Sequence, residues 1–308
     1  MNATEAKFLE STAGVQLVLT TAENIISMIA NLFLILVYFS SNKLRASLSN
    51  TLCASLASVD FLTSFFFMFK TIFLPYIKPW PGIWTTLFCH VLHSTFLMWA
   101  FVHSSWYHIV AITFDRFIAV IYPHKYKAFS NSKYIRYSFI VFSHILGGFS
   151  CGYLLVLTIE ENNECVFYLP NWPRFLKMYL LVTFTTFVTF VSTILWTLYS
   201  IIVYNVLFKS AKNKITKSQQ RATTMCIILV AEFCICSYPN AVFVMLFIID
   251  LVYEVGWGLT MDSTMFVITV QFIAASSFIN PIIYMIFNRS FHSAMFSFLS
   301  RFNPFKSM

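Results

Sequence analysis

Polar side chains recur within stretches of sequence that are otherwise apolar. They are Asn31, Asp60, Ser105, Ser276, Ser277 and Asn280. A carboxylate near hydroxyl and amide groups supplies the oxygen ligands that a hard cation such as sodium prefers, and it equally supports a hydrogen-bonded network with water. We therefore expect one cage, which holds either a sodium ion or no ion at all. Its members are Asp60, Ser105, Ser276, Ser277 and Asn280. No other cofactor is expected.

Helices inside a lipid bilayer must position these side chains. Hydrophobic residues make up 58% of the 308 residues and charged residues only 10%, which is too little polar surface for a soluble globule. The mean hydropathy is +0.74. Seven stretches reach the length of about 20 residues that a membrane-spanning helix needs. They are 22–41, 50–74, 86–121, 134–158, 175–208, 222–250 and 263–287. The predicted fold is an all-α membrane protein, a seven-transmembrane helix bundle with a short amphipathic helix after the last span.

The basic residues indicate which side of the membrane each connection faces. Fifteen of the 20 Lys and Arg residues follow the first, third, fifth and seventh stretches, and Asp115 is the only acidic residue among them. By the positive-inside rule these connections are cytoplasmic, and the amino terminus is extracellular. We therefore expect a multi-pass protein of the plasma membrane. The alternation favours membrane lipids as the partner of these charges and excludes nucleic acid.

This topology divides the chain into three regions. Residues 1–21 form an extracellular segment, 22–287 the transmembrane bundle, and 288–308 a cytoplasmic amphipathic helix with a short tail. The sequence Asn2-Ala3-Thr4 predicts N-linked glycosylation at Asn2. Five of the seven cysteines lie within apolar stretches, whereas Cys89 and Cys165 lie on the oxidising extracellular side. We therefore predict a disulfide between Cys89 and Cys165.

Motifs in most of these stretches, taken in order, resemble those of the rhodopsin-like G-protein-coupled receptors. The segment from Leu56 to Asp60 resembles the signature of the second span, and Asp115-Arg116-Phe117 resembles the end of the third. Further matches are Asn31, Ala119, Pro123, Tyr126, Tyr204, Phe233, Cys236, Pro239, the segment Asn280-Pro281-Ile282-Ile283-Tyr284, and Phe291. A single motif of this kind is weak evidence, but this many in register indicate a divergent member of the family.

The resemblance implies a receptor that transmits the binding of an extracellular ligand to a heterotrimeric G protein. It implies that Arg116 pairs with Asp115 in the inactive state. In the active state the sixth span swings outward about Pro239 and frees Arg116 toward Tyr204. The residues of this expected switch are Asp115, Arg116, Tyr204, Phe233, Pro239, Asn280, Pro281 and Tyr284.

The third span carries Met98 at the position where amine receptors of this family carry an aspartate. A protonated amine would find no counter-ion there, so we expect a neutral or lipid-like small molecule in preference to a monoamine. The expected pocket residues are Ser94, Thr95, Met98, Trp99, Val102, His103, Ser192, Asn240, Phe266 and Val270. The alternative is a short peptide held at the mouth of the bundle by Glu160, Glu161, Glu164 and Asp262.

Several residues near the expected pocket depart from the family pattern. Ser237 replaces a tryptophan, Trp196 replaces a proline and Trp106 replaces a small aliphatic residue, so the packing beneath the ligand must differ. Cys89 also lies two residues further from the Asp115-Arg116 pair than the family spacing. Such departures are compatible with a divergent chemosensory receptor.

Two other classes of membrane protein were weighed against a receptor. A transporter or channel calls for inverted repeats or broken helices in matched halves, which the sequence does not show. An intramembrane hydrolase calls for clustered histidine and acidic metal ligands. The histidines of the third span have no carboxylates beside them, so we expect no enzymatic activity.

Overall fold

The computed structural model describes residues 3–77, 82–161, 164–167, 172–208, 217–261 and 263–301. Asn2, Asp262 and the basic connection 209–216 lie outside the described residues, and so does Lys306.

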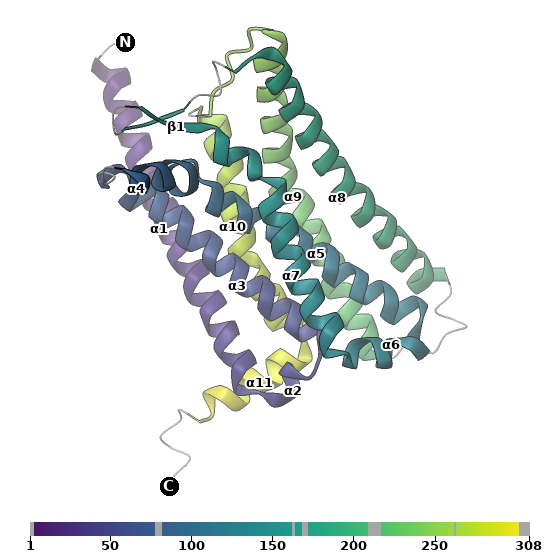
Figure 1. The fold of residues 1–308 in the computed structure, drawn as a ribbon. Coiled ribbons are helices and arrows are strands. Elements are labelled where there is room, and N and C mark those ends of the chain that lie inside the picture. Colours follow the sequence, from purple (N-terminus) through teal and green to yellow (C-terminus); the bar gives the residue numbers. More distant parts are fainter. Residues whose placement is uncertain are drawn as a thin grey trace.

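Seven long helices form one bundle (Figure 1). They are α1 (Ala3–Ser40), α3 (Leu48–Met68), α5 (Phe96–Ile121), α7 (Lys133–Ser150), α8 (Arg174–Phe208), α9 (Lys217–Tyr253) and α10 (Thr264–Phe287). All but α7 lie in segments long and apolar enough to cross a membrane. α7 carries Lys133 and Arg136 in its first turns and packs against α5 within the same bundle. The prediction of a seven-helix membrane protein is confirmed. α1 already begins at Ala3, so helix also occupies the segment expected to precede the first span.

Short helices link the long ones. They are α2 (Asn42–Arg45), α4 (Ile83–Leu87), α6 (Pro123–Asn131) and α11 (Arg289–Leu299), with the π-helical segments η1 (Phe69–Phe73) and η3 (Phe88–His93) and the 3-10 segments η2 (Leu74–Tyr76) and η4 (Gly152–Val156). Side-chain caps fix where several helices start, because the first N–H groups of a helix have no partner inside it. Ser132 caps α7 and Ser263 caps α10, each by accepting a hydrogen bond from a first-turn N–H. Asn288 caps α11, the predicted amphipathic helix.

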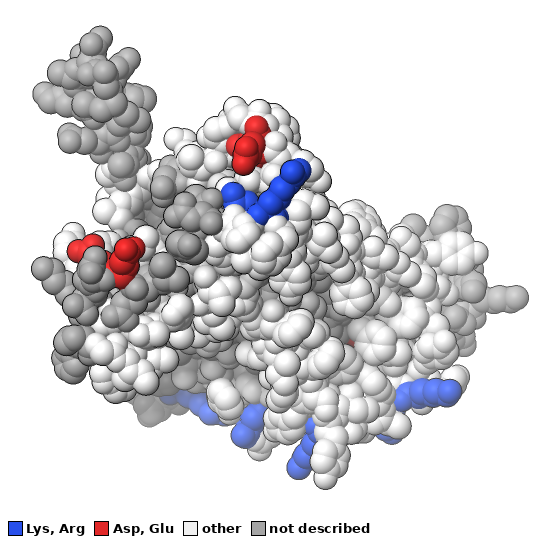
Figure 2. Space-filling view, turned by 45° about the horizontal axis from the view of Figure 1, so that its top comes forward, with Lys and Arg blue, Asp and Glu red and all other residues white. Residues whose placement is uncertain are grey.

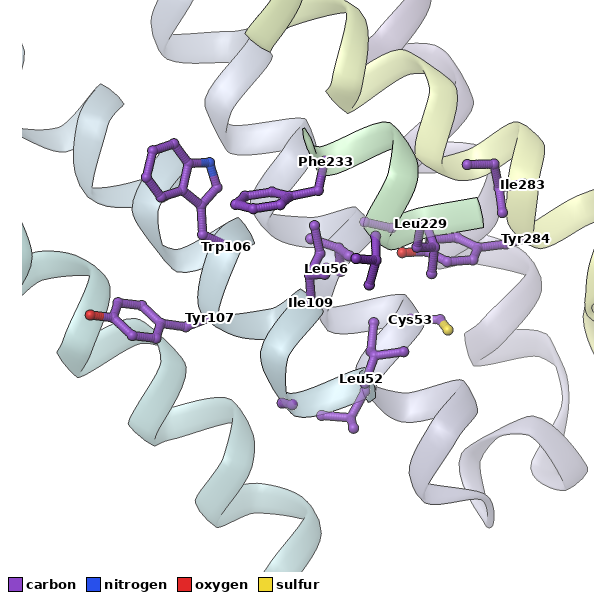
Figure 3. Close-up of a cluster of buried hydrophobic side chains, with 14 of the residues drawn as sticks. Leu52, Cys53, Leu56, Trp106, Tyr107, Ile109, Leu229, Phe233, Ile283 and Tyr284 are labelled. Atoms are coloured by element: carbon purple, nitrogen blue, oxygen red, sulfur yellow. The ribbon is translucent and has the colours of Figure 1, made fainter. Parts of the chain in front are cut away.

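The main core lies where α3, α5, α9 and α10 meet. Figure 3 shows Leu52 and Leu56 of α3, Trp106 of α5, Phe233 of α9 and Tyr284 of α10 converging on it. A second apolar cluster surrounds Leu180 and Phe184 of α8 and Ile248 of α9, nearer the other end of the bundle. Helices in lipid gain little from hydrophobic burial, so this close packing is what holds the bundle together.

A two-stranded hairpin follows α7 and covers one end of the bundle (Figure 1). Strand β1 (Thr158–Glu161) pairs antiparallel with β2 (Glu164–Phe167), and Glu160 lies opposite Cys165. Cys165 forms a disulfide with Cys89 of η3, with 5.3 Å between the two Cα atoms. The predicted disulfide is therefore confirmed, and it ties the hairpin to the segment that leads into α5.

Basic side chains collect at the end of the bundle opposite the hairpin (Figure 2). We call this the basic end. It contains α2, α6 and α11 (Figure 1), and among its described side chains are Lys43, Arg45, Lys125, Lys127, Arg221 and Arg289. Arg136 is buried there and donates hydrogen bonds to the carbonyl groups of Arg45 and Ala46 at the end of α2. This guanidinium therefore ties α7 to the connection between α1 and α3.

Gly147 of α7 lies close to the backbone of α5. A Cβ atom placed there would lie 2.1 Å from the hydroxyl oxygen of Ser104 and 2.7 Å from the carbonyl oxygen of Ala100. We expect Gly147→Ala to lower the free energy of unfolding by about 2 kcal/mol, because backbone must move to admit the methyl group. Thermal unfolding of the purified protein in detergent measures this loss. Gly148→Ala is the matched control, since a Cβ at Gly148 meets nothing within 4 Å. Equal losses for both variants would contradict a packing origin.

Candidate functional site

A carboxylate at the centre of the bundle joins three helices. Asp60 of α3 is 1% exposed. Its Oδ1 accepts a hydrogen bond from the Ser105 hydroxyl of α5 at 3.1 Å, and its Oδ2 accepts one from Nδ2 of Asn280 of α10 at 2.9 Å. Three of the five residues expected in the polar cage are therefore in direct contact.

The other two expected members take different positions. Ser277 enters the network through its backbone, since its carbonyl accepts a hydrogen bond from Nδ2 of Asn31 at 2.8 Å. Nδ2 of Asn31 also bonds Ser27, whose hydroxyl in turn bonds Ser64 of α3 at 2.7 Å. Ser276 lies close to Glu232 of α9 and not on Asp60. The polar network thus extends across α1, α3, α5 and α10 and reaches α9.

Several buried atoms of this network have no hydrogen-bond partner. They are Oδ1 of Asn31, Oγ1 of Thr63, both carboxylate oxygens of Glu232, Oδ1 of Asn280 and the hydroxyl of Tyr284. Four of these six are acceptors only. Such a set suits water or a small cation, because both supply the missing partners for carbonyl and carboxylate oxygens. Within the described residues, no three His, Cys, Asp or Glu side chains are grouped as a metal site.

At the basic end, Asp115 and Arg116 of α5 form an ion pair with a tyrosine as the third member. Nε of Arg116 donates to Oδ2 of Asp115 at 2.9 Å, and a terminal nitrogen of Arg116 contacts both Asp115 and the Tyr126 hydroxyl of α6. The Tyr126 hydroxyl donates to Oδ1 of Asp115 at 3.1 Å. Burial raises the pKa of the Tyr126 phenol to about 12, so the hydroxyl keeps the proton that it donates. We call these three residues the arginine cluster.

The remaining residues of the expected switch lie on α8, α9 and α10. Phe233 is 2% exposed and Tyr284 is fully buried, whereas Tyr204 of α8 is 53% exposed. Pro239 and Pro281 lie inside α9 and α10, each of which continues through its proline. Both prolines remove a backbone N–H from the helix and mark positions where it can bend.

Aromatic rings fill the space between Asp60 and the hairpin end. Trp106 stacks on Phe187 of α8 with the two ring centroids 5.5 Å apart. Trp106 also packs edge to face against Phe233 of α9, and these ring centroids are likewise 5.5 Å apart. His103 packs against the same two rings, Trp106 and Phe187. We call Trp106, Phe187, Phe233 and His103 the aromatic cluster. It links α5 and α8 to α9, and its member His103 is also one of the expected pocket residues.

The expected pocket residues lie on α5, α8, α9 and α10 and the turn before α5, but most are packed. Met98, Val102 and His103 are almost fully buried. Asn240 donates a hydrogen bond to Thr269 of α10 at 3.1 Å. Trp99, Phe266 and Val270 are partly buried against the two apolar clusters, Ser192 is also partly buried, and Ser94 bonds the carbonyl of His90. A small cavity of about 10 Å³ touches Thr95 and Met98, which is room for about one water molecule.

The arrangement of a central buried carboxylate, an arginine cluster at one end and two helices that each contain an internal proline agrees with the result of comparison with known families. The model of the seven-transmembrane receptors of the rhodopsin family matches residues 30–284. The chain belongs to this family. The receptor is also 23% identical over 307 residues to galanin receptor 2b of Danio rerio, in an alignment that covers 94% of this chain and 76% of that protein. The family consists of receptors and not of enzymes.

Three features of the receptor were not predicted from its sequence. Tyr126 was matched to the family but not placed in the switch, although it contacts both Asp115 and Arg116. His108 of α5 bonds Ser55 of α3 at 2.8 Å and packs against His144 of α7. The stacking partner of Trp106, Phe187, was also missed, since phenylalanines are too common in this chain to single one out.

Proposed function

We propose that this receptor transmits the binding of an extracellular ligand to a heterotrimeric G protein at its basic end. The arginine cluster is the observation that supports the proposal most directly. In this cluster Arg116 bonds two partners at the basic end, Asp115 and Tyr126. The cluster lies next to α9, whose Cys226 thiol lies 3.5 Å from Thr113 of α5. An outward movement of α9 about Pro239 removes that contact and leaves Arg116 accessible to a partner.

The proposed orientation places the basic end in the cytoplasm and the hairpin end outside the cell, at the plasma membrane. The charges support it, because basic residues gather at the basic end (Figure 2), whereas the acidic residues Glu161 and Glu164 belong to the hairpin. A disulfide between Cys89 and Cys165 is also at home on the oxidising side of the membrane.

For the ligand we propose a neutral or lipid-like small molecule. No carboxylate accompanies Met98 among the side chains expected to line the pocket, which combine apolar and aromatic residues with a few neutral hydrogen-bonding groups. A peptide that contacts Glu161 and Glu164 on the hairpin is the second candidate, favoured by their exposure. Galanin is a specific probe to include, since the zebrafish relative is a galanin receptor.

A G-protein activation screen in cells tests this function. The receptor is exposed to pooled lipids, neutral metabolites and peptides, with galanin as a separate sample, and dissociation of the G-protein subunits is recorded by energy transfer. We expect Arg116→Ala to reduce the response to any active ligand at least about tenfold, because the residue that meets the G protein is removed. Lys125→Ala is the control, since it removes an exposed charge from α6 outside the arginine cluster. Equal responses from wild type and Arg116→Ala at matched surface expression would refute the switch.

A further inference from the structure

A hydrogen bond joins α8 to α9 on the side of the bundle that faces lipid. The two helices pack against each other (Figure 1). The indole N–H of Trp196 of α8 donates to the hydroxyl of Tyr238 of α9 at 3.1 Å, and Trp196 is half-exposed. Both residues lie well inside segments long and apolar enough to cross a membrane. Water does not compete for the bond at this depth, and lipid chains offer no replacement partner when it breaks.

Tyr238 lies at the point where α9 can bend. It immediately precedes Pro239, the proline inside this helix. Pro239 has no N–H, so the carbonyl group of Ile235 lacks its helical hydrogen bond and the helix bends most easily between these residues. We call residues 235–239 the hinge. The bond from Trp196 therefore attaches α8 to the part of α9 about which the helix moves.

The same tyrosine also contacts the core. Its ring packs edge to face against Phe233, with ring centroids 5.8 Å apart, and Phe233 in turn packs against Trp106 in the aromatic cluster (Figure 3). Ser237 holds the position of the family's tryptophan before this proline, so Tyr238 is the aromatic residue next to it. Trp196 holds the position of a proline. The bond is thus built from residues at which this receptor departs from its family.

We propose that the hydrogen bond from Trp196 to Tyr238 is a lock that holds α9 in its resting position against α8. The lock fixes the rotation of the hinge and keeps Phe233 in the aromatic cluster. When the part of α9 that leads to the basic end moves outward, the lock opens. Removal of the lock therefore shifts the receptor toward the open state before any ligand binds. The lock rests on the proposed movement of α9 about Pro239, but not on which ligand or G protein the receptor uses.

The native thiol of Cys226 reports the position of α9 without an added label. It is 2% exposed and lies 3.5 Å from Thr113 of α5, so a reagent reaches it when α9 moves away. The purified receptor in nanodiscs is treated with N-ethylmaleimide, and site-resolved mass spectrometry gives the rate of modification. We expect Tyr238→Phe to raise the rate at Cys226 about threefold, the shift that follows loss of an average hydrogen bond between membrane helices. The buried Cys151 at the end of α7 should keep its wild-type rate.

A double-variant cycle tests the bond itself. Trp196→Phe removes the donor and should also raise the rate at Cys226. Combined with Tyr238→Phe it should give no further increase, because there is only one bond to lose. Tyr199→Phe is the matched control, since it deletes a hydroxyl from a ring that packs against Trp196, whereas the indole N–H bonds Tyr238. An unchanged rate in Tyr238→Phe overturns the lock, and so do additive effects, equal acceleration by Tyr199→Phe or equal acceleration at Cys151.

Basal G-protein activation in cells separates the lock from the proposed function. At matched surface expression, Tyr238→Phe should raise activation in the absence of ligand, and the added variant Arg116→Ala should abolish the increase. Faster modification of Cys226 with unchanged basal activation supports the lock and contradicts the proposed coupling to a G protein. Unchanged modification with raised activation overturns the lock, because α9 has then not moved as proposed.

Discussion

Replacement of Trp106 by alanine is expected to lower the free energy of unfolding by about 3 to 5 kcal/mol, the range for loss of a large buried aromatic side chain. Trp106 is 5% exposed and contacts Phe187, Phe233 and His103. In the unfolded state the helices are still surrounded by apolar lipid. The transfer of the indole ring from lipid into the protein core therefore contributes little to this loss. Most of it comes from ring contacts that a cavity cannot replace. We therefore expect a value toward the lower end of the range, measured by thermal unfolding in nanodiscs.

Trp196→Ala is the matched control for the same deletion. Trp196 is 48% exposed, and its indole N–H donates one hydrogen bond to the hydroxyl of Tyr238 at 3.1 Å. Its removal should cost about 1 kcal/mol, the value of one hydrogen bond. Trp106→Phe keeps one ring against Phe187 and should lose less than the alanine variant. If Trp106→Ala and Trp196→Ala lower the Tm equally, the aromatic cluster does not hold α5, α8 and α9 together.

The helices could be predicted because each membrane span needs an apolar stretch of about 20 residues. Hydropathy alone placed the end of the third span at 121 and the seventh at 263–287, and the structure has α5 end at Ile121 and α10 run from Thr264 to Phe287. The hairpin after α7 was not predicted. Each of its strands has only four residues, too few for an alternating pattern to be distinguished from an irregular loop.

The unusual position of Cys89 has a local explanation that spacing could not supply. The two residues in excess of the family spacing are absorbed before α5 begins. η3 is π-helical from Phe88 to His93, and Thr95 adopts the left-handed conformation with φ of 62°. Wider turns and a break in the helix change how many residues fit between Cys89 and Asp115. Cys89 consequently reaches Cys165 in spite of the different spacing.

Contacts at the candidate site could be predicted where both residues lie at the same depth in neighbouring membrane spans. Contacts that involve the connections between spans could not be predicted. Asp60, Ser105 and Asn280 were expected together, since mid-span residues of neighbouring helices meet. The contact of Tyr126 with Arg116 depends on how α6 folds back beneath α5, which no span pattern determines. The same holds for Arg136, whose partners are carbonyl groups of a connection and not side chains.

Glu232→Leu is expected to raise the free energy of unfolding by about 3 kcal/mol. Glu232 is 7% exposed, and neither of its carboxylate oxygens has a hydrogen-bond partner. Ser276 and Cys236 lie near the carboxylate. An unsatisfied buried group costs about 1 to 3 kcal/mol, and more when it is charged. Leucine fills a similar volume without that cost, so the Tm of the purified receptor should rise.

Glu232→Gln separates the cost of the charge from the cost of the polar group. Glutamine keeps the shape and replaces the carboxylate by a neutral amide that is still a buried polar group, so its gain should be smaller than that of leucine. Glu164→Gln on the exposed hairpin is the control and should leave the Tm unchanged. A lower Tm for both Glu232 variants would show that water or an ion satisfies the carboxylate. A higher Tm together with a weaker response to an active ligand would instead place Glu232 in the movement of α9, since a group that destabilises the resting bundle is retained where function requires it.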